Sequence, residues 1–191
     1  GKDYFLQLHL RPNKQVEIYT RYKMESNYIN FNPNQLTISP VLAQPKKNWR
    51  TYFSYALNTM FTFRSRTEIV WFDKNGEAAE QGFLIAADLL YNPIMKPYSA
   101  NVRLQYFETD GYNSRIYAYE NDVLYSFSIP AFYDKGYRVY FNLSYNVTKK
   151  FTVWARWARF YYPEKNSIGS GLDEINGRHK TNINIQAMYR F

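Results

Sequence analysis

Apolar and polar side chains alternate along most of this chain. In residues 137–147, for example, Val139, Phe141 and Leu143 are separated by polar side chains. Successive side chains of a β-strand point to opposite faces of a sheet, so this pattern predicts strands with one apolar and one polar face. It recurs in nine segments, which are residues 3–11, 15–25, 49–58, 60–72, 82–91, 99–108, 137–147, 151–162 and 181–191.

The length of these segments favours a membrane protein. A tilted strand needs about 9–11 residues to cross a bilayer, whereas strands of soluble domains have about 5–6. We therefore predict an all-β fold, a transmembrane antiparallel up-and-down β-barrel or its C-terminal arc, with about nine to ten strands. An amphipathic sheet of a soluble sandwich is the alternative interpretation.

The connections between the predicted strands are alternately short and long. Short turns are expected at residues 12–14, 58–59, 92–98 and 148–149, and long polar segments at 26–48, 73–81, 109–136 and 163–179. The segment 26–48 is expected to contain a short strand near 36–38, and Asn75-Gly76 is a hairpin-type pair. Arg159 interrupts the apolar face of 151–162, so that strand is expected to leave the apolar band there. In outer-membrane barrels short turns face the periplasm and long loops face outward, and this orientation is expected here.

The number of predicted strands is odd. Bacterial single-chain barrels normally have an even number of strands that begin and end in the periplasm. We therefore expect at least one strand before Gly1, so that residues 1–191 form one barrel region in the C-terminal part of a longer chain. If one strand has been miscounted, no additional strand before Gly1 is needed.

Composition agrees with alternation rather than with long apolar runs. Aromatic residues make up 20% of the chain, yet the mean hydropathy is −0.56. Without cysteine the chain has neither disulfides nor thiolate metal sites. The net charge of +8 suits an anionic partner, depending on where the charges point.

Basic residues gather on the faces assigned to the barrel lumen. Charge on the lipid face costs roughly 2–4 kcal/mol for Arg or Lys at mid-bilayer, which explains this sorting. Acidic residues on the same faces are fewer, chiefly Glu17, Glu68 and Asp88. Such a lumen either attracts anions or is filled by internal ion pairs. The predicted lumen cluster consists of Arg21, Arg64, Arg66, Arg103, Arg138, Arg156 and Arg190.

Residues 109–136 are too apolar for an exposed loop. A large apolar patch left in water is unusual for a monomer, so we expect this segment to fold into the barrel mouth or lumen as a plug. Arg115 and Glu120 are expected to meet lumen charges. Docking against a partner protein or strands above the membrane are the alternatives. The plug candidates are Arg115, Tyr117, Tyr119, Glu120, Tyr125 and Phe127.

The aromatic end of the chain and several weaker motifs bear on function. Tyr189 and Phe191 are typical of the C-terminal strand that the barrel-assembly machinery recognises, so we expect an assembly signal there. Gly169-Ser170-Gly171 lacks the Lys-Ser/Thr of a phosphate loop. No cofactor, no metal and no enzymatic activity are predicted. A Ca²⁺ site at acidic residues 110, 120 and 122 is an alternative interpretation. Another is a hydrolase with His9 or His179 as its base.

Two segments that break the alternation carry a family resemblance. Residues 108–130 read ETDGYNSRIYAYENDVLYSFSIP, and residues 168–175 read IGSGLDEI. Both segments resemble the C-terminal barrel of Bacteroidota envelope proteins named for an N-terminal helix-hairpin-helix domain. The resemblance extends over about residues 52–191. The resemblance implies the outer membrane of a Gram-negative bacterium. It makes nucleic acid a partner only through that absent DNA-binding domain.

Two functions remain open from the sequence. The favoured one is a structural or assembly component of an envelope complex, a barrel with a plugged basic lumen. Its expected partners are outer-membrane lipid, the barrel-assembly machinery and other envelope proteins. The alternative is a porin-like transport or DNA-handling barrel that passes anionic solutes or polymers.

Overall fold

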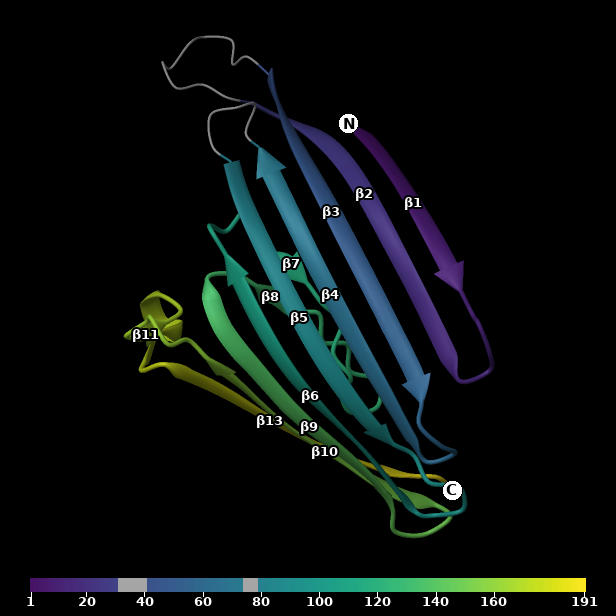
Figure 1. Cartoon of the computed structure of the whole chain (residues 1–191). Helices are drawn as coiled ribbons and strands as arrows, with labels where there is room; N and C mark the ends of the chain where they lie inside the picture. Colours follow the sequence, from purple (N-terminus) through teal and green to yellow (C-terminus); the bar gives the residue numbers. More distant parts are fainter. Residues whose placement is uncertain (31–40, 74–78) are drawn as a thin grey trace.

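One antiparallel sheet of nine strands dominates the structure (Figure 1). The computed structural model describes residues 1–30, 41–73 and 79–191. The nine predicted segments correspond to the nine strands of the sheet, so the all-β prediction is confirmed. In sheet order the strands are β1 (Lys2–Leu10), β2 (Val16–Asn30), β3 (Val41–Ala56), β4 (Phe61–Asp73), β5 (Ala79–Tyr91), β6 (Tyr98–Thr109), β9 (Lys135–Asn146), β10 (Phe151–Tyr161) and β13 (His179–Tyr189).

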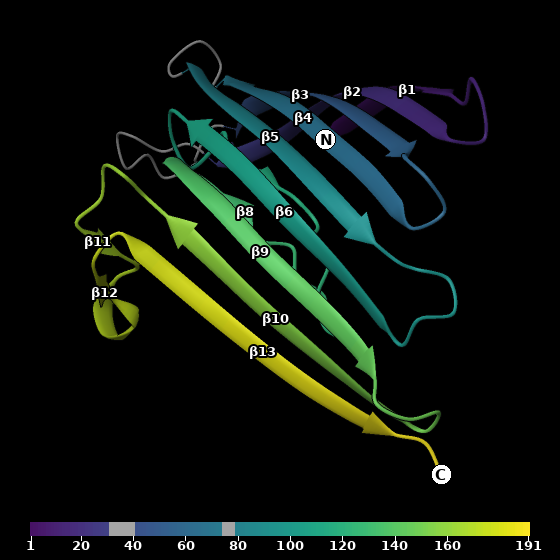
Figure 2. The same ribbon diagram turned by 60° about the horizontal axis from the view of Figure 1, so that its bottom comes forward.

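The sheet is curved and open. Each strand pairs only with its neighbours in the order above, which leaves β1 and β13 as the two edges. Figure 2 shows these edges on opposite sides of the arc. All neighbouring pairs are antiparallel. With nine strands, β1 and β13 therefore run in the same direction.

The expected long loop at residues 26–48 is wrong at both of its ends. β2 continues to Asn30 and β3 begins at Val41, and their register joins Asn30 to Val41. Pro45 suggested a loop because proline cannot donate to a sheet ladder. It lies where β3 pairs with β2 alone, since β4 joins β3 only from Lys46 onward, and a missing N–H is tolerated there. The short strand expected near residues 36–38 and the pair Asn75-Gly76 lie outside the described residues.

Other differences are local. β10 runs through Arg159 to Tyr161, and the last strand ends at Tyr189. Residues 110–134, here called the insertion, carry the paired short strands β7 (Ile116–Tyr117) and β8 (Ala131–Phe132). The connection from β10 to β13 contains β11 (Ser167–Ile168), the 3₁₀ turn η1 (Gly171–Asp173) and β12 (Ile175–Asn176). No helix in the described ranges is long and apolar enough to cross a membrane.

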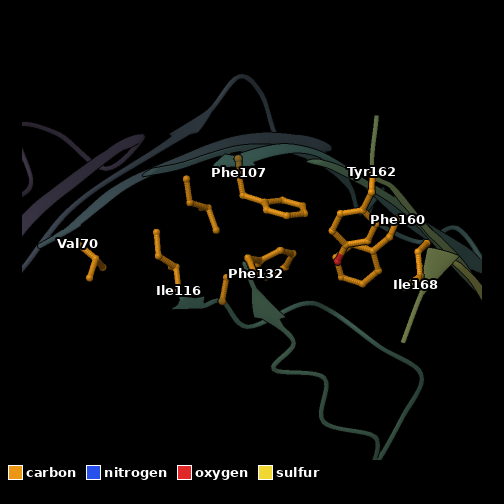
Figure 3. Close-up of a cluster of buried hydrophobic side chains, with 10 residues drawn as sticks. Val70, Phe107, Ile116, Phe132, Phe160, Tyr162 and Ile168 are labelled. Carbon is orange, nitrogen blue, oxygen red and sulfur yellow. The ribbon is translucent and has the colours of Figure 1, made fainter. Parts of the chain in front are cut away.

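A hydrophobic core forms between the sheet and the insertion. Figure 3 shows the sheet arching over these side chains, with the insertion on their other side. Phe107 and Phe132 are fully buried, with ring centroids 5.2 Å apart. The Tyr162 side chain, which follows β10, is also buried. The cluster comprises Val70, Leu84, Ala86, Phe107, Ile116, Ala118, Phe132, Phe160, Tyr162 and Ile168.

The start of the insertion is fixed closely against β5. The Glu80 carboxylate accepts hydrogen bonds from the backbone N–H groups of Asn113 and Ser114, both at 3.0 Å. Gly82 lies beneath Ser114, whose carbonyl oxygen would be only 2.4 Å from a Cβ placed on the glycine. The backbone of the insertion therefore approaches β5 at a position where a side chain would not fit.

Candidate functional site

Residues 117–122 of the insertion contact five strands of the inner face, which is the sheet face that carries the core. The side chains of Ile116, Ala118 and Glu120 are buried, whereas Tyr117 and Tyr119 are exposed. This alternation means that every second residue from Ile116 to Glu120 points at the sheet. Arginines from β4, β6, β9 and β10 bind this stretch.

The first group of charges lies on β3 and β4. Arg50 donates from Nε and Nη2 to the Glu68 carboxylate at 2.8 and 3.1 Å. Arg66 also donates to Glu68, and its Nη2 reaches the carbonyl oxygen of Tyr117 at 2.9 Å. Glu68 is therefore shared by two arginines, one of which also holds the insertion.

The second group joins β5 and β6. Arg103 makes a bidentate pair with Asp88, with Nε–Oδ1 at 2.6 Å and Nη2–Oδ2 at 2.7 Å. Its remaining Nη1 donates to the carbonyl oxygen of Tyr119 at 2.6 Å. The planar guanidinium thus binds a wall carboxylate and the insertion backbone at the same time.

The third group places a carboxylate of the insertion between two wall arginines. Arg138 on β9 donates to both Glu120 oxygens, at 3.0 and 2.9 Å. Arg156 on β10 also donates to Glu120, and to Asp122 at 3.0 Å. Asn184 on β13 donates to Asp122 at 3.1 Å. Residues 120 and 122 thereby connect the insertion to three strands.

Burial makes this third group energetically sensitive. The side chains of Glu120, Arg138 and Arg156 are 0%, 3% and 4% exposed. Buried ions lose several kcal/mol of hydration and recover it only when they are well paired. The Tyr140 ring, also fully buried, has the guanidinium carbons of Arg103 and Arg156 each 5.3 Å from its centroid. The network therefore fixes the position of the insertion as long as every member is present.

The predicted lumen arginines do not all belong to this network. Arg66, Arg103, Arg138 and Arg156 do, as described above. Arg21 and Arg64 lie on the same face, but the Nε atom of each is buried without a hydrogen-bond partner. Arg190 is exposed beyond the end of β13, where its N–H donates to the Lys150 carbonyl oxygen, so it is not part of the inner-face cluster.

The plug candidates lie in different environments. Glu120 meets the charges of Arg138 and Arg156. Arg115 instead donates to the Tyr112 carbonyl oxygen and to the Tyr117 hydroxyl, both at 2.8 Å. Tyr125 and Phe127 are 82% and 84% exposed, so the expectation that these bulky side chains pack against the barrel is wrong for them.

Sequence reasoning missed several contributing residues. Lys46 and Asn48 were assigned to a loop, although Asn48 donates to Glu68. Glu80 and Tyr140 were also missed. Glu80 lay in the predicted loop 73–81, although it binds the insertion backbone, and Tyr140 was placed on the polar face of its strand without a role, although its ring lies against Arg103 and Arg156. Asp122 was considered only as a Ca²⁺ ligand. Its distance of two residues from Glu120 indicates that both side chains leave the insertion on the same face.

The Ca²⁺ hypothesis finds no geometric support, whereas the absence of enzymatic activity stays a prediction. Within residues 1–30, 41–73 and 79–191, no group of three or more acidic, histidine or cysteine side chains is arranged to hold a metal ion. His9 Nε2 lies 2.8 Å from Glu17 Oε1, and the His179 ring stacks on Tyr161 with centroids 4.9 Å apart. Gly169 and Gly171 have φ angles of +86° and +63°, which is the backbone of a tight turn.

The last residues of the chain form an aromatic pair. Tyr189 and Phe191 are exposed, with ring centroids 5.3 Å apart, and their assembly role stays a prediction.

Comparisons of the chain with protein-family models, with curated proteins and with solved structures found no match. The resemblance of residues 108–130 and 168–175 to Bacteroidota barrels therefore also stays a prediction.

Proposed function

We propose that this sheet is a wall of a β-barrel in a bacterial outer membrane, and that the insertion seals its lumen so that the protein serves as a structural component of an envelope complex. One observation carries the proposal, namely the contrast between the two faces of the sheet. The inner face buries arginines and carboxylates, whereas the outer face exposes large apolar side chains on every strand except β4, where they are half-buried.

The outer face has the composition of a surface in contact with lipid. Leu8, Leu104, Phe141 and Ile185, from four different strands, are 58%, 59%, 44% and 74% exposed. Apolar surface of this extent is unfavourable in water by about 25 cal/mol for each Å², and exposed patches of this kind mark interaction surfaces. Aromatic residues such as Tyr22 and Trp49 accompany them, and tyrosine and tryptophan are common at membrane interfaces.

The direction of the two edge strands determines how many further strands can close this barrel. β1 and β13 run in the same direction. An odd number of further strands would pair antiparallel with both edges, so we propose that strands from outside this sheet close the wall. Direct pairing of β1 with β13 would be parallel, which is exceptional in such barrels.

Two neighbouring tryptophans provide the test of the membrane location. Trp154 and Trp157 both lie on β10, the first on the inner face and the second on the outer face. In the full-length protein, variants whose sole tryptophan is Trp154 or Trp157 are reconstituted into vesicles with brominated lipid. We expect bromine to quench Trp157 and to spare Trp154. Equal quenching of both, or a compact monomer without detergent, contradicts the proposal.

A transport function is the second candidate, and a specific observation favours it. The insertion does not cover β1, whose residues are all exposed, and Arg21 on the neighbouring strand β2 lines a basic cavity beside the insertion with its Nε unpartnered. A basic path beside the insertion would conduct anions.

Planar-bilayer recordings discriminate the two functions. A sealed scaffold is silent, and deletion of residues 112–133 opens it. Anion-selective conductance of the intact protein supports transport. If deletion changes neither conductance nor stability, the insertion is not a seal.

A further inference from the structure

A basic cavity lies between the insertion and the inner face of β2, β3 and β4. Its volume is about 180 Å³, and its lining includes Arg115 and Tyr117 from the insertion. Five basic side chains and two acidic ones, Glu25 and Glu68, line it. The basic residues are Arg21, Lys23, Lys46, Arg50 and Arg115.

Both carboxylates of the cavity already have cationic partners. Glu68 binds Arg50 and Arg66, as described above. Glu25 accepts a hydrogen bond from Lys23 Nζ at 2.6 Å. These pairs leave Arg21, Lys46 and Arg115 without an acidic partner in the part of the chain that the structure describes.

The three remaining cations come from both sides of the cavity. Lys46 Nζ donates to the carbonyl oxygens of Asn113 and Arg115, at 3.1 and 3.3 Å. Neutral carbonyls orient this ammonium but do not compensate its charge. The Arg21 side chain makes no hydrogen bond within the described residues, and its Nε is buried. Its register partner on β3 is Arg50, and like charges opposite each other on neighbouring strands are destabilising.

We propose that this cavity binds a compact oxyanion such as a phosphate group, held by Arg21 and Lys46 from the wall and by Arg115 from the insertion. Guanidinium and ammonium groups donate strong, charge-assisted hydrogen bonds to phosphate oxygens. The bound anion relieves the repulsion between Arg21 and Arg50 and links the insertion to the wall. The site deepens the proposed function by naming a ligand of the inner face, but its geometry does not require a membrane.

The test uses the full-length protein in a neutral detergent without phosphate. Inorganic phosphate and a short-chain phosphatidylglycerol are titrated separately, and binding is followed by calorimetry and by the shift in Tm. Inorganic phosphate represents a soluble anion, and phosphatidylglycerol represents a lipid headgroup. Arg21→Gln, Lys46→Gln and Arg115→Gln remove the proposed contacts one at a time. Arg64→Gln is the matched control, because Arg64 lies on the inner face with a buried, unpartnered Nε but does not line the cavity.

We expect each of the three cavity variants to bind the anion about tenfold more weakly or worse, since a lost charge-assisted hydrogen bond is worth at least that factor. Arg64→Gln should bind like the wild type. Stronger binding of phosphatidylglycerol than of phosphate assigns the site to a headgroup, and the reverse assigns it to a soluble anion.

The idea is overturned if neither probe binds, or if Arg64→Gln weakens binding as much as Arg21→Gln. Unfolding without anion, measured for every variant, separates lost binding from misfolding, and Arg21→Lys, which keeps the charge, should retain part of the affinity. Loss of lipid quenching at Trp157 would contradict the membrane location alone, so the two proposals fail by different measurements.

Discussion

The inner face of the sheet has two halves that differ in their environment although their residue types are alike. The covered half, from β4 to β10, lies under the insertion, and its Glu120–Arg138 pair is 0% and 3% exposed. The open half, at β1 and the adjoining start of β2, carries the pair His9–Glu17, whose side chains are 39% and 38% exposed. The same alternation of charged and apolar residues therefore produces a buried network in one half and solvated pairs in the other.

This difference shows that desolvation, rather than the presence of charge, determines what an ion pair contributes. Exposed pairs are worth about 0–1 kcal/mol, because water competes for both partners. A buried pair contributes little net stability when intact, but loss of one partner costs about 3–5 kcal/mol. In the covered half Glu68 and Glu120 each bind two arginines, so loss of either carboxylate affects more than one arginine.

The largest expected difference between the halves concerns their carboxylates. Glu120→Gln removes the charge shared by Arg138 and Arg156, and should lower the free energy of unfolding by about 3–5 kcal/mol. Glu17→Gln, the control in the open half, should lower it by less than about 1 kcal/mol. Urea titration of the protein folded in detergent micelles measures both. Similar losses would show that the two halves are equally hydrated.

A second variant keeps the charge but changes the geometry. Arg103→Lys cannot pair in a bidentate manner with Asp88 and also reach the Tyr119 carbonyl oxygen, so we expect a loss of about 1.5–3 kcal/mol. Arg11→Lys in the open half alters a pair whose arginine is 67% exposed, and should change stability by less than about 0.5 kcal/mol. An Arg103→Lys protein as stable as the wild type would mean that charge alone holds the insertion.

The close approach of the insertion to β5 can be tested with one added methyl group. Gly82→Ala forces the Ser114 carbonyl oxygen away and should cost about 1–3 kcal/mol. Ser54→Thr adds a carbon on the inner face of β3, where the insertion does not reach, and should be neutral within about 0.5 kcal/mol. Hydrogen exchange of residues near 114 should accelerate only in Gly82→Ala. Unchanged exchange there would place the insertion farther from the sheet.

The smallest effect is expected on the side of the insertion that faces away from the sheet. Phe127 is 84% exposed, so Phe127→Ala should change the free energy of unfolding by less than about 0.5 kcal/mol. Phe132→Ala, the buried counterpart in the same insertion, should cost about 3–5 kcal/mol. A loss above about 1 kcal/mol for Phe127→Ala would reveal a partner surface that covers this side, since exposed substitutions rarely exceed half that value.

The sequence alone determined the sheet and the assignment of its faces. Alternation with a period of two is a local property, so the nine strands and the inward direction of Arg103, Arg138 and Arg156 could be read without any tertiary information. The limits of β2 and β3 could not, because a polar, proline-containing segment becomes a strand only when a neighbour supplies its hydrogen bonds. Pro45 is tolerated for this reason at a position with a single neighbouring strand.

Only the tertiary structure decided which charges are buried and how the insertion lies. The apolar content of residues 109–136 predicted that they pack, but not that Ile116 and Phe132 face the sheet while Tyr125 and Phe127 face away. It also did not show that Glu120 pairs with Arg138 and Arg156 while Arg21 lacks a carboxylate. Strand periodicity specifies a face, whereas pairing and desolvation depend on which segment, distant in the sequence, covers that face.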